Sequence, residues 1–214
     1  MKHLLTLSLI TFVASTPLLS RQDGSSYDCI PGMACWPTEA QWATFNVTVE
    51  GRLRKTIPYA APCYVNHPAY DFAQCQAVQQ NYTSGTARSN VYGAMEGIQY
   101  EACGTSDCQL VSVAPFLPPL FQQCELGRMS AYYVDALVSR HVEETLKFVA
   151  RWNIRLSIKN TGHDYLGRSS VPNSVALWTH NMKEMKYYQS WTAKDCPRIA
   201  KTNIGEIGKW HSRA

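Results

Sequence analysis

The segment 159–170, which reads KNTGHDYLGRSS, gathers residue types that suit the binding of an anion such as a phosphate or pyrophosphate. Gly162 and Gly167 permit positive φ and let a ligand approach the backbone closely, and successive N–H groups in such a loop can form an anion nest. Positive charge and hydroxyl donors are supplied by Lys159, Arg168, Thr161, Ser169 and Ser170. The residues alone leave a second interpretation open, an ordinary glycine-containing surface turn with a solvated imidazole at His163.

Other motifs for phosphate or acyl chemistry do not fit the chain. No G-x-G-x-x-G follows a strand, and in the stretch 203–210 Asn203 and Trp210 occupy the first glycine and the Ser/Thr positions of a P-loop. No G-x-S-x-G is present, so a secreted hydrolase lacks its nucleophile pattern. No C-x-x-C is present, which disfavours a zinc site.

A strand–helix–strand pattern precedes the loop and would position it. Residues 132–138 are predicted to form a strand. Ser139 is predicted to cap the helix that follows, and Asn153 to end it. The apolar residues of this helix recur at helical spacing, at Val142, Leu146, Val149 and Ala150. Residues 154–158 alternate, which predicts a strand with Ile154, Leu156 and Ile158 on one face. With a third strand over 175–179, the order predicts parallel strands joined by a crossover.

The region before this unit is predicted to be mainly helical. Thr38 and Gln41 form a capping-box pattern, and the spacing of Trp42, Phe45 and Val49 predicts a helix over 39–49 with an apolar core face. A second helix is expected from Asp71 to about Tyr82, with Phe72, Cys75 and Val78 on one side. Prolines at 115, 118 and 119 make residues 109–124 a connection.

The N-terminus has the pattern of a secretory signal. Lys2 and His3 precede an apolar run over 4–14, and small residues follow, so residues 1–20 are expected to be removed and the protein secreted. All 8 cysteines lie after this segment, which predicts disulfides, with Cys103–Cys108 a plausible close pair and Cys196 a further disulfide cysteine. Asn46 and Asn81 begin two glycosylation sequons.

Composition limits the classes of partner. The net charge of +4 over 214 residues is dilute and contains no basic run, which argues against nucleic-acid binding. No long apolar stretch follows the signal, so no membrane association is expected after its removal. The oligomeric state is left open.

The run 154–169, with its core G-H-D-Y-x-G-R-S, resembles the pyrophosphate loop of FAD-linked oxidases of the berberine-bridge-enzyme-like type, within the vanillyl-alcohol-oxidase superfamily that has a PCMH-type FAD-binding domain. The resemblance is closest to secreted fungal members and covers roughly residues 29 to 196. Supporting motifs lie at 62–64, 100–103, 148–153 and 177–183. The resemblance implies an incomplete α+β fold, in which a disulfide-rich helical section precedes a β-α-β unit and the pyrophosphate loop.

In that family the histidine of the motif is joined covalently to the 8α carbon of FAD, and the matching residue is His163. Attachment raises the flavin's potential, which helps it accept hydride from poor donors such as sugars or other alcohols. The resemblance implies that the diphosphate is held by Asn160, Thr161, Gly162, Asp164, Gly167, Arg168 and Ser169. Lys159 is expected either to join this set or to be a solvated strand-end charge, and His180 is expected to be structural.

The sequence departs from the family after residue 200, where a polar tail replaces the expected strand. We expect a signal over 1–20, a Cys-rich section over 21–121, the first half of the FAD domain over 122–200 and an aberrant tail over 201–214. The substrate domain with the catalytic base is missing from this pattern. The chain is therefore expected to be a truncated product that retains flavin weakly or not at all and is weakly active or inactive alone.

Two functions are therefore expected to compete. The first is an FAD-linked oxidoreductase that takes hydride from a sugar or secondary metabolite and is reoxidised by O₂. The second is a non-catalytic secreted, disulfide-rich pseudo-enzyme or binding protein, which an absorbance scan over the flavin bands would distinguish.

Overall fold

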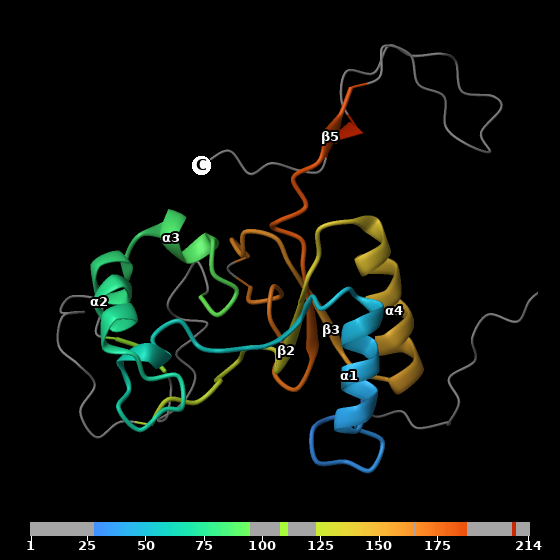
Figure 1. The fold of residues 1–214 in the computed structure, drawn as a ribbon, viewed down its shortest axis with the longest axis horizontal. Helices are drawn as coiled ribbons and strands as arrows, with labels where there is room; N and C mark the ends of the chain where they lie inside the picture. Colours follow the sequence, from blue (N-terminus) through green and yellow to red (C-terminus); the bar gives the residue numbers. More distant parts are fainter. Residues whose placement is uncertain (1–27, 95–107, 111–122, 165, 188–206, 209–214) are drawn as a thin grey trace, which may run out of the picture.

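A computed structural model describes residues 28–94, 108–110, 123–164, 166–187 and 207–208. Its centre is a four-stranded sheet in the order β1-β2-β4-β3 (Figure 1). The strands are β1 (Leu53–Lys55), β2 (Tyr132–Asp135), β3 (Leu156–Lys159) and β4 (Val175–Trp178). Both β2 and β3 pair with β4 in parallel, whereas β1 adds to β2 in the antiparallel direction. This small mixed sheet with helices confirms the predicted α+β fold class.

The strand–helix–strand unit is confirmed, but β2 ends at Asp135 rather than at 138, and β3 begins at Leu156 rather than at 154. Its helix differs in its buried face, where the predicted Leu146 and Ala150 are exposed, and in its start. Helix α4 (Ser139–Trp152) connects β2 to β3, and β4 lies between those two strands. The helix begins one residue earlier than predicted, because Val138 is the N-cap and no side chain caps it. Where a capping side chain is absent, the backbone N–H of Leu137, just before the helix, donates to Nδ1 of His141 in its first turn (3.2 Å). Asn153 ends the helix in the left-handed conformation (φ 50°), as predicted.

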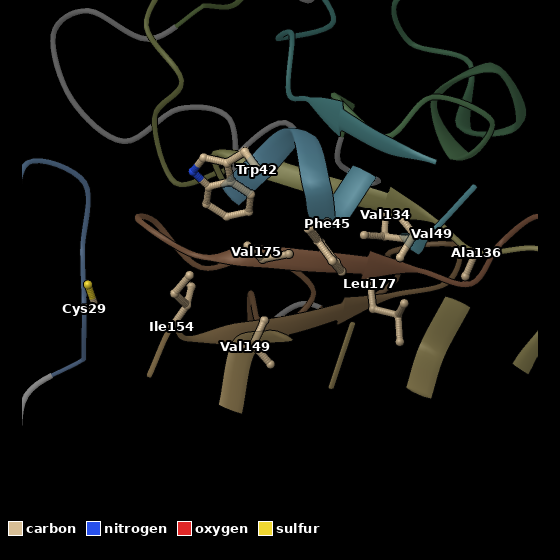
Figure 2. Close-up of a cluster of buried hydrophobic side chains, with 10 residues drawn as sticks. All are labelled: Cys29, Trp42, Phe45, Val49, Val134, Ala136, Val149, Ile154, Val175 and Leu177. Carbon is tan, nitrogen blue, oxygen red and sulfur yellow. The ribbon is translucent and has the colours of Figure 1, made fainter. Parts of the chain in front are cut away.

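Helix α1 (Glu39–Thr48) begins with the predicted capping box of Thr38 and Gln41. It lies beside α4 on one face of the sheet, and the rings of Phe45 and Phe148 stack with centroids 4.0 Å apart (Figure 1). Figure 2 shows the resulting core between α1, α4 and the strands. Its buried members are Cys29, Trp42, Phe45, Val49, Val134, Ala136, Val149, Ile154, Val175 and Leu177. Residues of the predicted Cys-rich section and of the predicted FAD-domain half thus share one core.

The predicted apolar face of the strand over 154–158 is only partly buried. Ile154 and Leu156 pack into or against the core, but Ile158 is 57% exposed. The reason is its position, since β3 is an edge strand and Ile158 lies near its carboxyl end. The buried residues of this end are instead Ser157 and Lys159, on the opposite face.

A second, smaller core lies around α2 (Phe72–Asn81) and the 3₁₀ turn η1 (Ala61–Cys63). The short helix α3 (Gly85–Ser89) adds the buried Arg88, whose guanidinium lies over the rings of Tyr59 and Tyr82. The predicted second helix is confirmed, with Asp71 as its N-cap. Cys75 and Val78 are buried as predicted, but Phe72 is 66% exposed. Phe72 is the first residue of α2, and the part of the helix that packs into the core begins one turn later, at Cys75.

Three disulfides confirm the general cysteine prediction: Cys29–Cys35, Cys63–Cys75 and Cys108–Cys124. The expected pair Cys103–Cys108 is wrong, because the partner of Cys108 is Cys124, at a Cα separation of 4.0 Å. Closeness in sequence is therefore a poor guide to pairing here. Cys103 and Cys196 lie outside the described residues.

The signal segment 1–20 and most of the polar tail 201–214 also lie outside the described residues. Of the tail, Ile207–Gly208 forms β6, which pairs with β5 (Met185–Lys186) in the antiparallel direction. No helix within the described ranges has the length and apolar character needed to cross a membrane.

Candidate functional site

The predicted anion loop leaves β3 at its carboxyl end, where ligands bind in sheets of this kind. It is fixed to the neighbouring strand β4 and the residues that follow. The indole Nε1 of Trp178 donates to the carbonyl of Asn160 (3.1 Å), and the backbone N–H of Thr179 donates to the carbonyl of Lys159 (2.9 Å). The start of the loop is thus held rigidly against the sheet.

Gly162 is required by the conformation of the loop. Its φ is +101°, and a Cβ there would lie 2.8 Å from Cε of Lys159. Thr161 before it is buried, whereas His163 after it is exposed. The chain therefore turns at Gly162 so that the imidazole reaches the surface, while the preceding residues stay packed. Gly167, the second glycine of the motif, also has positive φ (+77°).

Asp164 organises the second half of the loop. Its carboxylate accepts from Nε of Arg168 (2.7 Å) and Nη2 of Arg168 (3.1 Å), and from the backbone N–H groups of Leu166 (3.2 Å) and Arg168 (2.9 Å). The Arg168 hydrogen bond, with these backbone donors, lowers the pKa of Asp164 to about 2. The charge of Arg168 is therefore balanced within the loop, and the backbone N–H groups of this half are directed at a side chain of the protein itself.

Lys159 is buried, and the expectation of a solvated strand-end charge is wrong. Its exposed fraction is 0%, and Nζ donates to the carbonyls of Val91 (3.1 Å), Tyr92 (3.1 Å) and Ala94 (2.6 Å). The ammonium also lies 5.2 Å from the ring centroid of Tyr92 and 5.9 Å from that of Trp178. Its predicted contact with a diphosphate stays a prediction.

Buried hydroxyls continue this polar face of the sheet, and the sequence analysis missed most of them. Oγ of Ser130 lies 2.9 Å from Oγ of Ser157 and accepts from Oγ of Ser174 (2.8 Å). Ser170, predicted as an anion donor, instead donates to the carbonyl of Arg128 (3.2 Å) and accepts from the N–H of Ser130 (3.2 Å). These serines join the end of the loop to the starts of β2 and β4.

Tyr92 covers these serines from a distant part of the sequence. Its ring stacks on Tyr133 with centroids 4.1 Å apart, and burial raises the pKa of its phenol to about 12. Side-chain hydrogen bonding to Ser130, Ser170 and Ser157 works against this rise in pKa. No periodicity or motif marks Tyr92, and only its buried position against the sheet reveals it.

His180 lies at the same carboxyl edge, packed against the ring of Trp178 (centroids 5.5 Å apart). Its Nε2 is 2.9 Å from Oδ1 of Asn90, which makes Nε2 the donor. Burial, with Lys183 and Lys159 nearby, lowers the pKa of His180. The imidazole therefore fills a packed position rather than an exposed one.

The remaining predicted sites are placed as follows. Asn46 lies within α1 and its side-chain oxygen accepts from the N–H of Leu53 (3.0 Å), whereas Asn81 ends α2 and is exposed. Ser169 is half-buried in the loop. In the part of the chain that the structure describes, no three His, Cys, Asp or Glu residues gather as a metal site.

The chain is similar in sequence to FAD-linked oxidoreductases and flavoprotein oxidases. An FAD-linked oxidoreductase of Arthroderma benhamiae is 36% identical over 169 residues, covering 79% of this chain and 28% of that protein. A VAO-type flavoprotein oxidase, VAO615, of Thermothelomyces thermophilus is 34% identical over 166 residues, covering 77% of this chain and 27% of that protein. No protein-family model matches the chain.

The fold is similar to that of a solved flavoprotein. The crystal structure of the VAO-type flavoprotein MtVAO615 from Myceliophthora thermophila C1 superposes with a TM-score of 0.67 at 31% identity. The match covers 84% of this chain and 30% of the solved one. The chain thus spans less than a third of the length of the proteins it matches.

Proposed function

Because the chain belongs to the vanillyl-alcohol-oxidase superfamily of FAD-linked oxidases, we propose that its 160–169 loop holds FAD and that the protein serves an oxidoreductase reaction. The single observation that carries this proposal is the exposed imidazole of His163, which the conformation of Gly162 brings to the surface at the carboxyl edge of the sheet. That edge is where ligands bind in parallel sheets.

The residues present fit a flavin dinucleotide at this loop. Gly162 has a positive φ and no room for a Cβ beside Lys159, which keeps a glycine at this position of the motif. Asp164 and Arg168 neutralise each other, so the carboxylate does not leave an unbalanced negative charge beside a diphosphate. We assign the diphosphate to the stretch 160–164 with Gly167, Arg168 and Ser169, and the covalent bond to His163.

When bound, FAD supplies the redox chemistry by accepting a hydride from the substrate. The role of the chain's own residues is to bind and orient it: His163 as the attachment point and Trp178 as the support of Asn160 beneath the loop. The proposal extends to a sugar or secondary-metabolite substrate, to O₂ as the electron acceptor, and to a secreted, glycosylated protein of the berberine-bridge-like type.

The test is covalent flavin. Since the chain spans about a third of its relatives' length or less, non-covalent FAD is expected to be held weakly, and the decisive signal is flavin that survives acid precipitation. The chain is expressed, purified and precipitated, and flavin fluorescence is measured on a denaturing gel. The proposal expects fluorescence from the unaltered chain, its loss in His163→Ala, and its retention in the matched control His67→Ala, which alters a histidine away from the loop. A chain without acid-stable flavin would contradict it.

A further inference from the structure

We infer that Lys159 is a positioning residue: its buried ammonium holds the Val91–Ala94 segment and the turn at Gly162 in one fixed arrangement. For its bearing on flavin attachment, the inference rests on the proposed function. The two parts that it joins are more than 60 residues apart in the sequence, with hydrogen-bond separations of 65, 67 and 68.

The first support is the match between donors and acceptors. A lysine ammonium has three N–H donors, and the carbonyls of Val91, Tyr92 and Ala94 accept at 2.6 to 3.1 Å. The aromatic rings of Tyr92 and Trp178 flank the charge. A fully buried cation is costly unless it is satisfied in this way, and its removal would leave carbonyls buried without a donor. These three carbonyls therefore depend on this one side chain for their donor.

The second support is the contact with Gly162. The aliphatic stem of Lys159 lies directly below this glycine, so close that a Cβ would meet Cε at 2.8 Å. The loop is thus seated on the lysine stem, one residue before the exposed His163. Because the stem cannot move without losing its three carbonyls, the position of the turn and the position of the Val91–Ala94 segment are coupled.

The third support is that the segment is rigid on its other sides. The carbonyl of Gly93 accepts from the N–H of Tyr59 (2.9 Å), and a side chain at position 93 would collide with the backbone of Ile57. Just before it, Asn90 binds His180. The segment is therefore a fixed support, and Lys159 transmits that support to the loop.

The experiment replaces the charge while keeping the length of the side chain. Hydrogen–deuterium exchange is followed by mass spectrometry on the full purified chain for the unaltered protein and for Lys159→Met. We expect exchange to be about tenfold or more faster at both 91–94 and 160–164, because three charge-assisted hydrogen bonds are lost. The matched control Lys147→Met removes an exposed lysine that pairs with Glu144 and should leave both segments unchanged. Unaltered exchange at either segment in Lys159→Met would overturn the inference.

A second variant covers the case in which Lys159→Met does not fold. Lys159→Ala leaves a space for a small cation, and propylammonium added to it should restore slow exchange at both segments, whereas the uncharged propanol should not. Equal rescue by propanol would overturn the inference, because space-filling alone would then explain the role of the stem.

A measurement of acid-stable flavin distinguishes a failure of this inference from a failure of the proposed function. If the unaltered chain carries acid-stable flavin, Lys159→Met should carry several-fold less, and propylammonium should restore it in Lys159→Ala. Undiminished flavin in Lys159→Met would overturn the positioning role. If the unaltered chain carries no flavin, the proposed function fails, and the exchange measurements alone decide the inference.

Discussion

The two faces of the four-stranded sheet are built on opposite principles. The face under α1 and α4 is apolar, with stacked aromatic rings such as Phe45 on Phe148 and aliphatic strand residues such as Val134 and Leu177. The other face buries Lys159 and a chain of serine hydroxyls under Tyr92. The first face buries few polar side chains, among them His141 and Thr145 of α4, whereas the second is lined by hydroxyls and an ammonium that need hydrogen-bond partners.

We assign the apolar face mainly to the stability of the fold and the polar face to the positioning of the loop. Burial of apolar area stabilises the fold without directing it toward any ligand, so the helix face serves as a support. The polar face fixes backbone positions through hydrogen bonds of defined length, and it ends at the loop that presents His163. We expect substitutions on the first face to lower the free energy of unfolding, and those on the second to change the position of the loop as well.

The largest effect is expected at Phe45, in the centre of the apolar face. Phe45→Ala removes a ring that is 3% exposed and stacked on Phe148, and should lower the free energy of unfolding by about 3–5 kcal/mol. Urea denaturation measures it. Val47→Ala, on the same helix but 79% exposed, is the control and should change stability by less than about 0.5 kcal/mol. Equal losses in the two variants would refute the assignment of this face.

Gly162→Ala should have the next largest effect. The positive φ and the contact with Lys159 together should cost about 2–4 kcal/mol. Gly51→Ala is the matched control, since Gly51 also has positive φ (+73°) but has no atoms within 4 Å of the added methyl, and it should cost about 1 kcal/mol. Thermal or urea unfolding compares the two, and indistinguishable values would show that Lys159 does not fill the space beneath the loop.

Ser130→Ala tests the hydroxyl chain of the polar face. Loss of its contacts with Ser157 and Ser174 should cost about 1–2 kcal/mol in urea unfolding. Ser139→Ala is the control, because Ser139 is exposed and caps no helix. A measurable loss in Ser139→Ala would restore its predicted role as a cap.

The smallest effect is expected from the ion pair in the loop. The pKa of Asp164 is lowered in the folded protein to about 2, from an ordinary 3.8, so its stabilising effect is present above about 3.8 and is lost as pH falls through about 2. Both side chains reach solvent, and the change should be confined to the loop. NMR titration of the Asp164 carboxyl should show the low midpoint in the unaltered chain, and Arg168→Met should return it toward 3.8. A midpoint near 3.8 in the unaltered chain would contradict the pairing.

The sequence predicts the apolar face well and the polar face poorly. Periodicity predicts α1 with its buried residues Trp42 and Phe45, because helical spacing reports a buried stripe. It predicts α4 as a helix but not its buried face: Leu146 and Ala150 are exposed, and the buried residues are His141, Thr145 and Val149. Ile158 was misplaced, because alternation cannot tell an edge strand from a covered one. Lys159 could not be recognised as buried, since its three acceptors lie at Val91, Tyr92 and Ala94 and belong to no local pattern. The family resemblance predicts the loop over 160–169, whereas the contacts of Lys159 that support this loop are visible only in the fold.

The central claim, that the polar face presents His163 for flavin attachment, is tested most directly by peptide mapping. Trypsin cleavage after Lys159 and Arg168 releases the peptide 160–168, which contains His163 and no other histidine. Mass spectrometry of the purified chain should find this peptide heavier by one flavin dinucleotide, with the fragment ions placing the addition on His163. A chain that carries acid-stable flavin on any other peptide, with 160–168 at its unmodified mass, would contradict the account.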